Sequence, residues 1–202
     1  MGKEKKPEPW EIIRSQEGPD LHLFTVHYDW YRNPRNNLEF KRLVLKTPEW
    51  VNIVAITPDN KFITVNQYRF GVRKVTCEIP GGLVDQGETS QDAAERELQE
   101  ETGYSTSEWM YLGAVEPNPA FQTNLCHHWL AENVQKTANP ALDAGEDITV
   151  TALTFEELRT VIREGKFCHV LALSALSRIP QLWCGFNKTD FFYDSNQNIR
   201  CP

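Results

Sequence analysis

The sequence predicts an α/β fold in which helices cover a mixed β-sheet, with a semi-independent cluster of antiparallel strands at the N-terminus. Two observations predict this class. Strand-like patterns fill the N-terminal part of the 202-residue chain before any clear helical pattern begins. After the first helix, strand-like and helical segments alternate, which is typical of a sheet packed between helices. The length fits one domain, or one domain with a small appendage.

The expected strands show period-2 alternation or short runs of β-branched and aromatic residues. Apolar and polar side chains alternate in residues 21–30, and the turn residues 33–37 separate this strand from the next. Pro58, Asp59 and Asn60 predict a hairpin between two β-rich runs. The predicted strands are residues 21–30, 40–45, 51–57, 61–67, 76–79, 110–115, 127–131 and 148–153.

The helices are predicted from apolar spacing and from their end signals. Thr89 and Asp92 can form a capping box at the start of the clearest helix, and Gly103 can end it. Thr154 is the capping residue of the next helix. No element is predicted for the polar, turn-rich tail at 185–202. The predicted helices are residues 90–102, 154–165 and one that begins over 170–176.

Composition and charge disfavour several functional classes. Lys and Arg number 21 against 28 Asp and Glu, and the net charge of −7 argues against a protein whose main partner is nucleic acid. Apolar runs are far shorter than the roughly 18–20 residues of a membrane-spanning helix, so we expect no membrane partner. The charged, proline-rich residues 1–10 do not resemble a secretory signal. Five cysteines without a C-x-x-C pair indicate a reduced, cytoplasmic chain.

Acidic side chains are dense in the helix at 90–102 and suggest two interpretations. The plainer one is a charged helix that faces solvent, as most charge runs do. At about 100° per residue, however, Glu97 and Glu101 fall within the arc of about 140° that also holds the apolar Leu98, with Glu100 at its edge. The wheel therefore predicts that these carboxylates face the body of the protein.

Clustered carboxylates that lose their hydration need a proton or a cation nearby. Anionic ligands made only of oxygen suit a hard divalent ion, Mg²⁺ or Mn²⁺. Arg96 is placed to hold a neighbouring carboxylate, and Glu88 is the leading partner. The Pro80-Gly81-Gly82 turn lets the backbone approach, so that a carbonyl can join the metal shell.

These residues resemble the Nudix box, G-x5-E-x7-R-E-U-x-E-E-x-G-U. Gly82, Glu88 and the run from Arg96 to Gly103 occupy every fixed position, and the one departure is Tyr104, where the pattern prefers an aliphatic residue. The resemblance implies the Nudix α/β/α sandwich. It also implies hydrolysis of a nucleoside diphosphate that is linked to another moiety.

The resemblance implies a role for each residue of the box. The metals would neutralise the pyrophosphate and bring a water toward hydroxide. Arg96 and Glu88 are expected to orient the site, and Glu100 is counted among the catalytic residues as well as the ligands. The implied metal ligands are Glu97, Glu100, Glu101 and the backbone carbonyl of Gly81.

Residues 65–82, with Q-Y-R and E-x-P-G-G elements, resemble the strand that leads into the box in ADP-ribose pyrophosphatases. Arg69 then matches an arginine that contacts substrate phosphate, and Glu78 matches a binding or metal-adjacent residue. A surface salt bridge is the alternative for Arg69. The acidic loop at 143–150 resembles the one that supplies a catalytic glutamate, and Glu146 is the expected general base. An exposed acidic turn is the alternative. Because Asp147 is adjacent, the sequence leaves open which of the two acids matches the catalytic position.

Features outside the box bear on substrate and assembly. Pro119 lies near the downstream proline associated with ADP-ribose, but its surroundings lack the Ser-Pro-Gly run, so a broader nucleoside diphosphate sugar hydrolase stays open. In relatives of this type the N-terminal strands pair across a homodimer, and aromatic residues there stack on the base. Trp30 and Trp50 are the candidates, with filling of a small core as the alternative. The expected divisions are residues 1–50, a dimer-forming strand region; residues 51–184, the hydrolase domain; and residues 185–202, the tail.

The leading hypothesis is a Mg²⁺-dependent hydrolase, with Mn²⁺ as the alternative metal, that cleaves the pyrophosphate bond of ADP-ribose or a related nucleoside diphosphate sugar. The expected products are a nucleoside monophosphate and a sugar phosphate. Two alternatives are a ligand-sensing module without catalysis and a Nudix hydrolase of another substrate, such as a nucleoside triphosphate or a dinucleotide. His127 and His128 are not expected to be catalytic, and Cys77 and Cys126 are expected to be core thiols.

Overall fold

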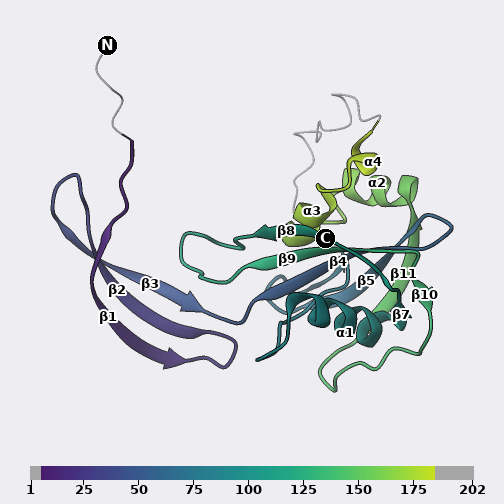
Figure 1. The fold of residues 1–202 in the computed structure, drawn as a ribbon, viewed down its shortest axis with the longest axis horizontal. Helices are drawn as coiled ribbons and strands as arrows, with labels where there is room; N and C mark the ends of the chain where they lie inside the picture. The colour runs from purple at the N-terminus through teal and green to yellow at the C-terminus, as the bar shows by residue number, and fades with distance from the viewer. Residues whose placement is uncertain (1–5, 185–202) are drawn as a thin grey trace, which may run out of the picture. The chain divides into compact units, whose positions relative to one another are not determined.

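The elements of the fold are those of a computed structural model, which describes residues 6–184 (Figure 1). The tail at 185–202 lies outside these residues. Contacts divide the chain into two units, and each is described by itself. Residues up to Pro48 and Glu116–Leu125 form the first unit; Glu49–Val115 and the residues from Cys126 onward form the second.

The first unit is an antiparallel sheet of three strands in the order β1-β2-β3. β2 (Thr25–Arg32) and β3 (Glu39–Lys46) correspond to predicted strands. β1 (Glu11–Asp20) was not predicted, because its residues are polar or exposed along nearly its whole length and show no alternation. Residues 21–24, which alternation assigned to a strand, instead form the turn that joins β1 to β2: the Leu21 amide donates to the Phe24 carbonyl.

The second unit contains a mixed sheet in the order β11-β5-β4-β9-β8, with β6 paired to the end of β5 that lies beyond β4. β4 and β9 run parallel and the other pairs antiparallel. The hairpin predicted between β4 and β5 is confirmed. The strands are β4 (Trp50–Ile56), β5 (Lys61–Arg69), β6 (Lys74–Glu78), β8 (Glu108–Val115), β9 (Cys126–Glu132) and β11 (Ile148–Thr154), with a separate two-stranded pair of β7 (Tyr104–Ser105) and β10 (Gln135–Lys136).

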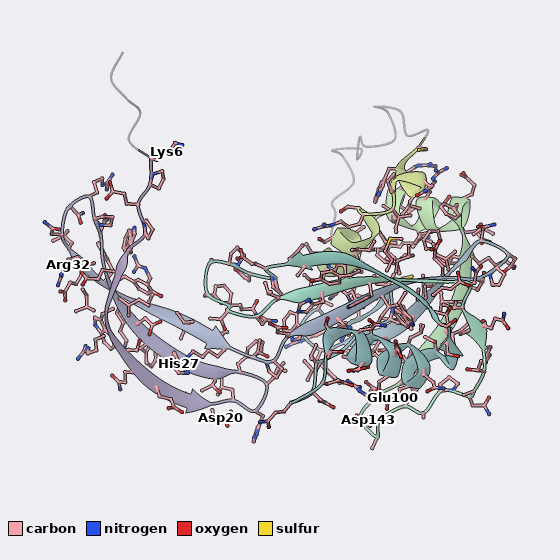
Figure 2. All side chains as sticks on the ribbon, in the orientation of Figure 1. Lys6, Asp20, His27, Arg32, Glu100 and Asp143 are labelled. Atoms are coloured by element: carbon pink, nitrogen blue, oxygen red, sulfur yellow. The ribbon has the colours of Figure 1, made fainter. Side chains whose placement is uncertain are left out.

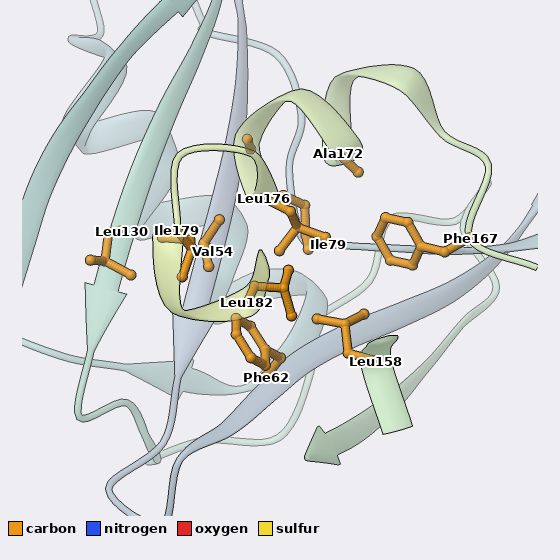
Figure 3. Packing of buried hydrophobic residues seen from close by; sticks show 11 residues of the cluster. Val54, Phe62, Ile79, Leu130, Leu158, Phe167, Ala172, Leu176, Ile179 and Leu182 are labelled. Carbon is orange, nitrogen blue, oxygen red and sulfur yellow. The ribbon is translucent and has the colours of Figure 1, made fainter. Parts of the chain in front are cut away.

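Helices cover both faces of this sheet, which confirms the predicted class (Figure 1). α1 (Ser90–Thr102) packs on one face through Ala93, Ala94 and Leu98. On the other face, α2 (Phe155–Arg163), α3 (Val170–Leu176) and α4 (Pro180–Trp183) close a larger apolar cluster (Figure 3). No helix among residues 6–184 is long and apolar enough to cross a membrane.

Both ends of α1 form as predicted. The Thr89 hydroxyl accepts from the Asp92 amide, the Asp92 carboxylate accepts from the Thr89 amide, and together they make the capping box. Gly103 ends the helix at φ 76°, in the left-handed region, and its amide donates to the Gln99 carbonyl. A Cβ built on Gly103 would lie 2.2 Å from the Ala138 carbonyl oxygen. The helix end therefore needs glycine for two reasons, backbone conformation and space.

Gly103→Ala is expected to lower the free energy of unfolding by about 3 kcal/mol, since it adds a backbone clash to the left-handed strain. Gly87→Ala is the matched control: Gly87 has φ 88° but nothing within 4 Å of its Cβ position. That variant should lose only about 1 kcal/mol. Urea denaturation of the two variants measures the difference, and equal losses would show that the clash contributes nothing.

Candidate functional site

Three glutamates of α1 lie where the helical wheel places them. Glu101 is 4% exposed, and the side chain of Glu97 is 13% exposed, so both face the sheet. Glu100, predicted at the edge of the arc, has a side chain that is 46% exposed. One oxygen of Glu101 accepts from the Gly81 amide at 2.9 Å. The alternative of a wholly solvated helix is therefore wrong, because the carboxylates turn inward.

The glycine turn brings backbone against these carboxylates. Residues 80–82 run beside β4, where Val51 and Gly82 exchange amide–carbonyl hydrogen bonds. A Cβ on Gly82 would lie 2.1 Å from Oε1 of Glu97, so a larger residue here would displace that carboxylate from its present position. Among residues 6–184, no donor bonds to the Gly81 carbonyl. This oxygen is therefore free to accept a further partner, and its role as a metal ligand stays a prediction.

Arg96 donates hydrogen bonds to three acidic side chains of the site and fixes their positions. Its Nε and Nη2 donate to the two oxygens of Glu88, both at 3.0 Å, which is the predicted pairing. Its Nη1 donates to Glu97 at 2.9 Å and to Glu100 at 3.1 Å. Hydrogen bonds to Glu88 and then to Glu97 and Glu100 hold the pKa of Arg96 well above its usual range. The guanidinium thus compensates the outer part of the acidic cluster and fixes its geometry.

The inner part of the cluster is short of positive charge. Burial, together with the charges of Glu97 and Glu146, raises the pKa of Glu101 to about 8, although the hydrogen bond from the Gly81 amide lowers it. Burial also raises the pKa of Glu97, despite its bond to Arg96. A site that must keep these groups ionised needs more positive charge than the protein supplies.

Oxygen donors of this kind fit a hard divalent cation. Glu97, Glu100 and Glu101 supply carboxylates and Gly81 supplies a carbonyl. In the part of the chain that the structure describes, no three His, Cys, Asp or Glu side chains converge closely enough to hold a metal as they stand. Arg96 Nη1 bridges Glu97 and Glu100, so these carboxylates are paired with a guanidinium in this arrangement. The donor chemistry fits such an ion, and the side chains must close around it.

The metal-free protein is expected to lose stability as the pH rises from about 6.5 to about 8, above the range in which the lowered pKa of buried His128 makes stability rise with pH. Glu101 has a higher pKa folded than unfolded, so the folded state binds its proton more tightly and loses that advantage as the proton leaves. Thermal unfolding in EDTA should show a fall in Tm of roughly 5 °C or more across this window. Glu101→Gln should flatten this slope, whereas Glu95→Gln, on the exposed side of α1, should keep it. An unchanged slope in Glu101→Gln would contradict the assignment.

Arg69 and Glu78 meet at the ends of β5 and β6. The Arg69 Nε and Nη2 donate to the two oxygens of Glu78 at 2.9 and 2.7 Å. Glu78 is 2% exposed, whereas the Arg69 side chain is 42% exposed. The charges of Glu101 and Glu146 contribute to the raised pKa of Arg69, so its guanidinium lies in the field of the acidic cluster. The salt bridge that was the alternative interpretation of Arg69 does exist, but its carboxylate is buried.

Glu146 lies on the loop between β10 and β11. Its side chain is half-buried and accepts from the Asp143 amide at 3.1 Å. Its charge acts on the pKa of both Glu97 and Glu101, which places it near the inner carboxylates. Figure 2 shows the loop at Asp143 close to Glu100, and the Ala141 amide donates to the Glu100 carbonyl. The loop therefore brings this acid to the C-terminal part of α1.

The three remaining predicted residues are Trp30, Trp50 and Pro119. Trp30 and Pro119 belong to the first unit, and their assignment stays a prediction. The Trp30 ring faces the guanidinium of Arg14 at 3.7 Å and the ammonium of Lys41 at 5.2 Å. Pro119 is exposed in a turn, and Trp50 is half-buried at the start of β4.

Sequence reasoning missed two residues beside this site, because no motif marks them. The Thr76 hydroxyl donates to Oε1 of Glu78 at 2.5 Å, and Nε2 of His169 lies 3.8 Å from Oε2 of Glu78. Period-2 alternation places Thr76 on the same face of β6 as Glu78 and could have indicated it. His169 comes from the start of α3, far along the chain, and no sequence signal pointed to it.

Within residues 6–184, the histidines of β9 and the thiol of Cys126 are not bonded to the residues of this site. His127 contacts Glu49 at 2.7 Å and Tyr111 at 2.9 Å. His128 is fully buried, burial lowers its pKa to about 4, and its ring nitrogens have no partner within residues 6–184. Burial raises the pKa of Cys126 to about 12, so this thiol is inert, as expected of a core cysteine.

Comparisons with known proteins identify the domain family and a similar fold. The model of the NUDIX domain matches residues 46–171. An ADP-ribose pyrophosphatase of Bacillus subtilis is 33% identical over 155 residues, which cover 76% of this chain and 80% of the relative. A methanol dehydrogenase activator of Bacillus methanolicus is 35% identical over 64% of this chain and 70% of its own length. The crystal structure of an ADP compounds hydrolase superposes with a TM-score of 0.77 at 22% identity, over 88% of this chain and 96% of that one.

Proposed function

The chain belongs to the NUDIX domain family, and on that premise we propose that it hydrolyses the pyrophosphate bond of ADP-ribose or a related nucleoside diphosphate sugar. The products are a nucleoside monophosphate and a sugar phosphate. One observation carries the proposal: the buried carboxylates of α1 share one electrostatic field with the half-exposed Arg69 and with Glu146. A phosphate-binding cation beside an acidic metal site is the arrangement that a diphosphate substrate requires. The B. subtilis relative carries the name of this activity.

The proposed cofactor is Mg²⁺, with Mn²⁺ as the alternative. Glu97, Glu100, Glu101 and the Gly81 carbonyl would hold it, because hard oxygen ligands suit these ions. When bound, such an ion neutralises pyrophosphate charge, polarises P–O bonds and lowers the pKa of water.

The chain's own residues divide the remaining work. Arg69 binds a phosphate of the substrate and Glu146 accepts the proton of the attacking water. Arg96, held by Glu88, fixes the orientation of Glu97 and Glu100, whose carboxylates it bonds directly. Glu78 belongs to the substrate-binding group through its bond to Arg69.

A homodimer is part of the proposal. The sheet of the first unit exposes Ile12 by 55% and Leu43 by 46%, and nearly every residue of β1 is exposed. A three-stranded sheet with so little buried side-chain area is marginal on its own, so a second copy is a suitable partner. Trp30 and Trp50 would then stack on the base of the nucleotide, and Pro119 would line the same site. Light scattering coupled to size exclusion tests the mass.

The chain is proposed to act in the cytoplasm on a small-molecule nucleotide sugar, without nucleic-acid or membrane partners. Its net negative charge repels a polyanion and so disfavours nucleic acid as a partner.

The test is a substrate panel with Mg²⁺: ADP-ribose, ADP-glucose, GDP-mannose, UDP-glucose, NADH and a nucleoside triphosphate, with products resolved by chromatography. Release of a nucleoside monophosphate and a sugar phosphate supports the proposal. Turnover of only the triphosphate or NADH indicates a hydrolase of another substrate. Binding of ADP-ribose at equilibrium without any product indicates a ligand-sensing module.

A further inference from the structure

Glu78 is buried, and both of its carboxylate oxygens accept hydrogen bonds. Its Oε1 accepts from Nε of Arg69 at 2.9 Å and from the Thr76 hydroxyl at 2.5 Å. Its Oε2 accepts from Nη2 of Arg69 at 2.7 Å and has Nε2 of His169 at 3.8 Å. Burial alone would raise the pKa of Glu78, but the bonds from Arg69 and Thr76 outweigh it and hold the pKa below its usual value. With both oxygens engaged and 2% exposure, this carboxylate has no free edge for a ligand.

Arg69 is anchored along one edge of its guanidinium and open along the other. Nε and Nη2 are committed to Glu78, and within residues 6–184 Nη1 bonds to no other group. A planar fork held on one side presents its remaining N–H groups in a fixed direction, which a lysine ammonium cannot do. The half-exposed side chain therefore offers a pre-oriented donor pair in the field of Glu101 and Glu146.

The negative charges of Glu101 and Glu146 are the reason why Arg69 needs Glu78 as a fixed partner. Glu101 and Glu146 both attract Arg69, and an unanchored arginine near them would pair with one of them. Such a pairing would remove the arginine from the substrate and would partly neutralise the carboxylates of the metal site. Glu78 supplies a competing, buried counterion with better geometry, because it offers two oxygens to the fork.

His169, at the start of α3, also lies beside Glu78. Its Nδ1 accepts from the Ala172 amide at the start of α3, at 3.4 Å, which leaves the proton of a neutral imidazole on Nε2. That nitrogen is the one directed at Oε2 of Glu78. Burial lowers the pKa of His169 and the charge of Glu78 opposes this, so the neutral ring is favoured near pH 7.

We propose that Thr76, Glu78 and His169 are positioning residues that hold Arg69 ready to bind a phosphate of a nucleoside diphosphate sugar. The inference rests on the proposed function for the identity of the ligand. Glu78 acts through Arg69, and neither Thr76 nor His169 touches the substrate. The arrangement stabilises the bound substrate and the transition state alike, so its loss raises KM and leaves kcat nearly unchanged.

The test compares three threonine variants in the Mg²⁺ assay. Thr76→Val removes the hydroxyl that bonds Glu78 and should raise KM for ADP-ribose about 10-fold, with kcat changed by less than about threefold. Thr76→Ser keeps the hydroxyl and should restore the wild-type KM. Thr64→Val is the matched control, because Thr64 is fully buried in neighbouring β5 and its hydroxyl donates to the Thr151 carbonyl at 3.0 Å. It should lower Tm without changing KM.

His169→Asn gives an independent variant, since asparagine also caps helices but is too short to approach Glu78. It should raise KM by a smaller factor, about threefold, because 3.8 Å is a weak contact. The inference is overturned if Thr76→Val keeps the wild-type KM, or if Thr64→Val shifts KM by as much.

A second readout needs no turnover. The Arg69 Nε–H should give a resolved, slowly exchanging ¹⁵N NMR signal in the wild type and in Thr64→Val, and a broadened one in Thr76→Val. A wild type that cleaves no member of the panel rejects the proposed function, while this signal still decides whether Thr76 orders Arg69. An unchanged signal in Thr76→Val rejects the positioning role even where ADP-ribose is cleaved.

Discussion

Glu101→Gln is expected to lower kcat roughly a thousandfold or more while the far-UV circular dichroism spectrum stays unchanged. Glutamine has the same shape and keeps an oxygen to accept from the Gly81 amide, so the local packing survives. It removes the negative charge, which no other group at that buried position replaces. An anionic ligand for a divalent ion is therefore lost, and the affinity for Mn²⁺, measured by electron paramagnetic resonance, should fall in parallel.

Glu95→Gln controls for charge removal from the same helix. Glu95 is exposed and accepts a hydrogen bond from Gln91 on the solvent side, so this variant should keep wild-type turnover and Mn²⁺ affinity. If Glu101→Gln also kept both, with its spectrum intact, the role of Glu101 as a ligand would be wrong. If its spectrum collapsed, the residue would be structural.

The inward direction of the α1 carboxylates could be predicted from the sequence because helical geometry is local. Ala94 and Leu98 set the buried face, and Glu97 and Glu101 share it whatever the rest of the chain does. The cap at Thr89 was predictable for the same reason. Local rules of this kind depend only on spacing along the chain.

The arrangement around Arg69 could not be predicted in the same way. Thr76 and His169 are ordinary residues by type, and they gain importance only when β6 and the start of α3 meet at Glu78. β1 was missed for a related reason: its strand conformation comes from pairing with β2, and its own residues show no alternation. A strand that forms through long-range pairing need not show a pattern of its own, even where its partner strand does.

Glu146→Gln is expected to lower kcat by about 10²–10³ and to leave KM for ADP-ribose within about threefold, as is usual when a general base is lost. The glutamine can still accept from the Asp143 amide, so the loop should keep its conformation. The affinity for Mn²⁺ should also stay unchanged, which separates this residue from Glu101. The measurement is steady-state kinetics with a Mn²⁺ titration of each variant.

Asp147→Asn tests which of the two adjacent acids is the general base, because Asp147 follows Glu146 directly and is exposed. Of these two acids, Glu146 is the one whose charge acts on the pKa of Glu97 and Glu101, so removing the charge of Asp147 should change kcat by less than about twofold. A large loss in Asp147→Asn with an active Glu146→Gln would move the base by one residue. Equal, small effects would exclude this loop as the source of the base, since a proton acceptor must lie within hydrogen-bond reach of the attacking water.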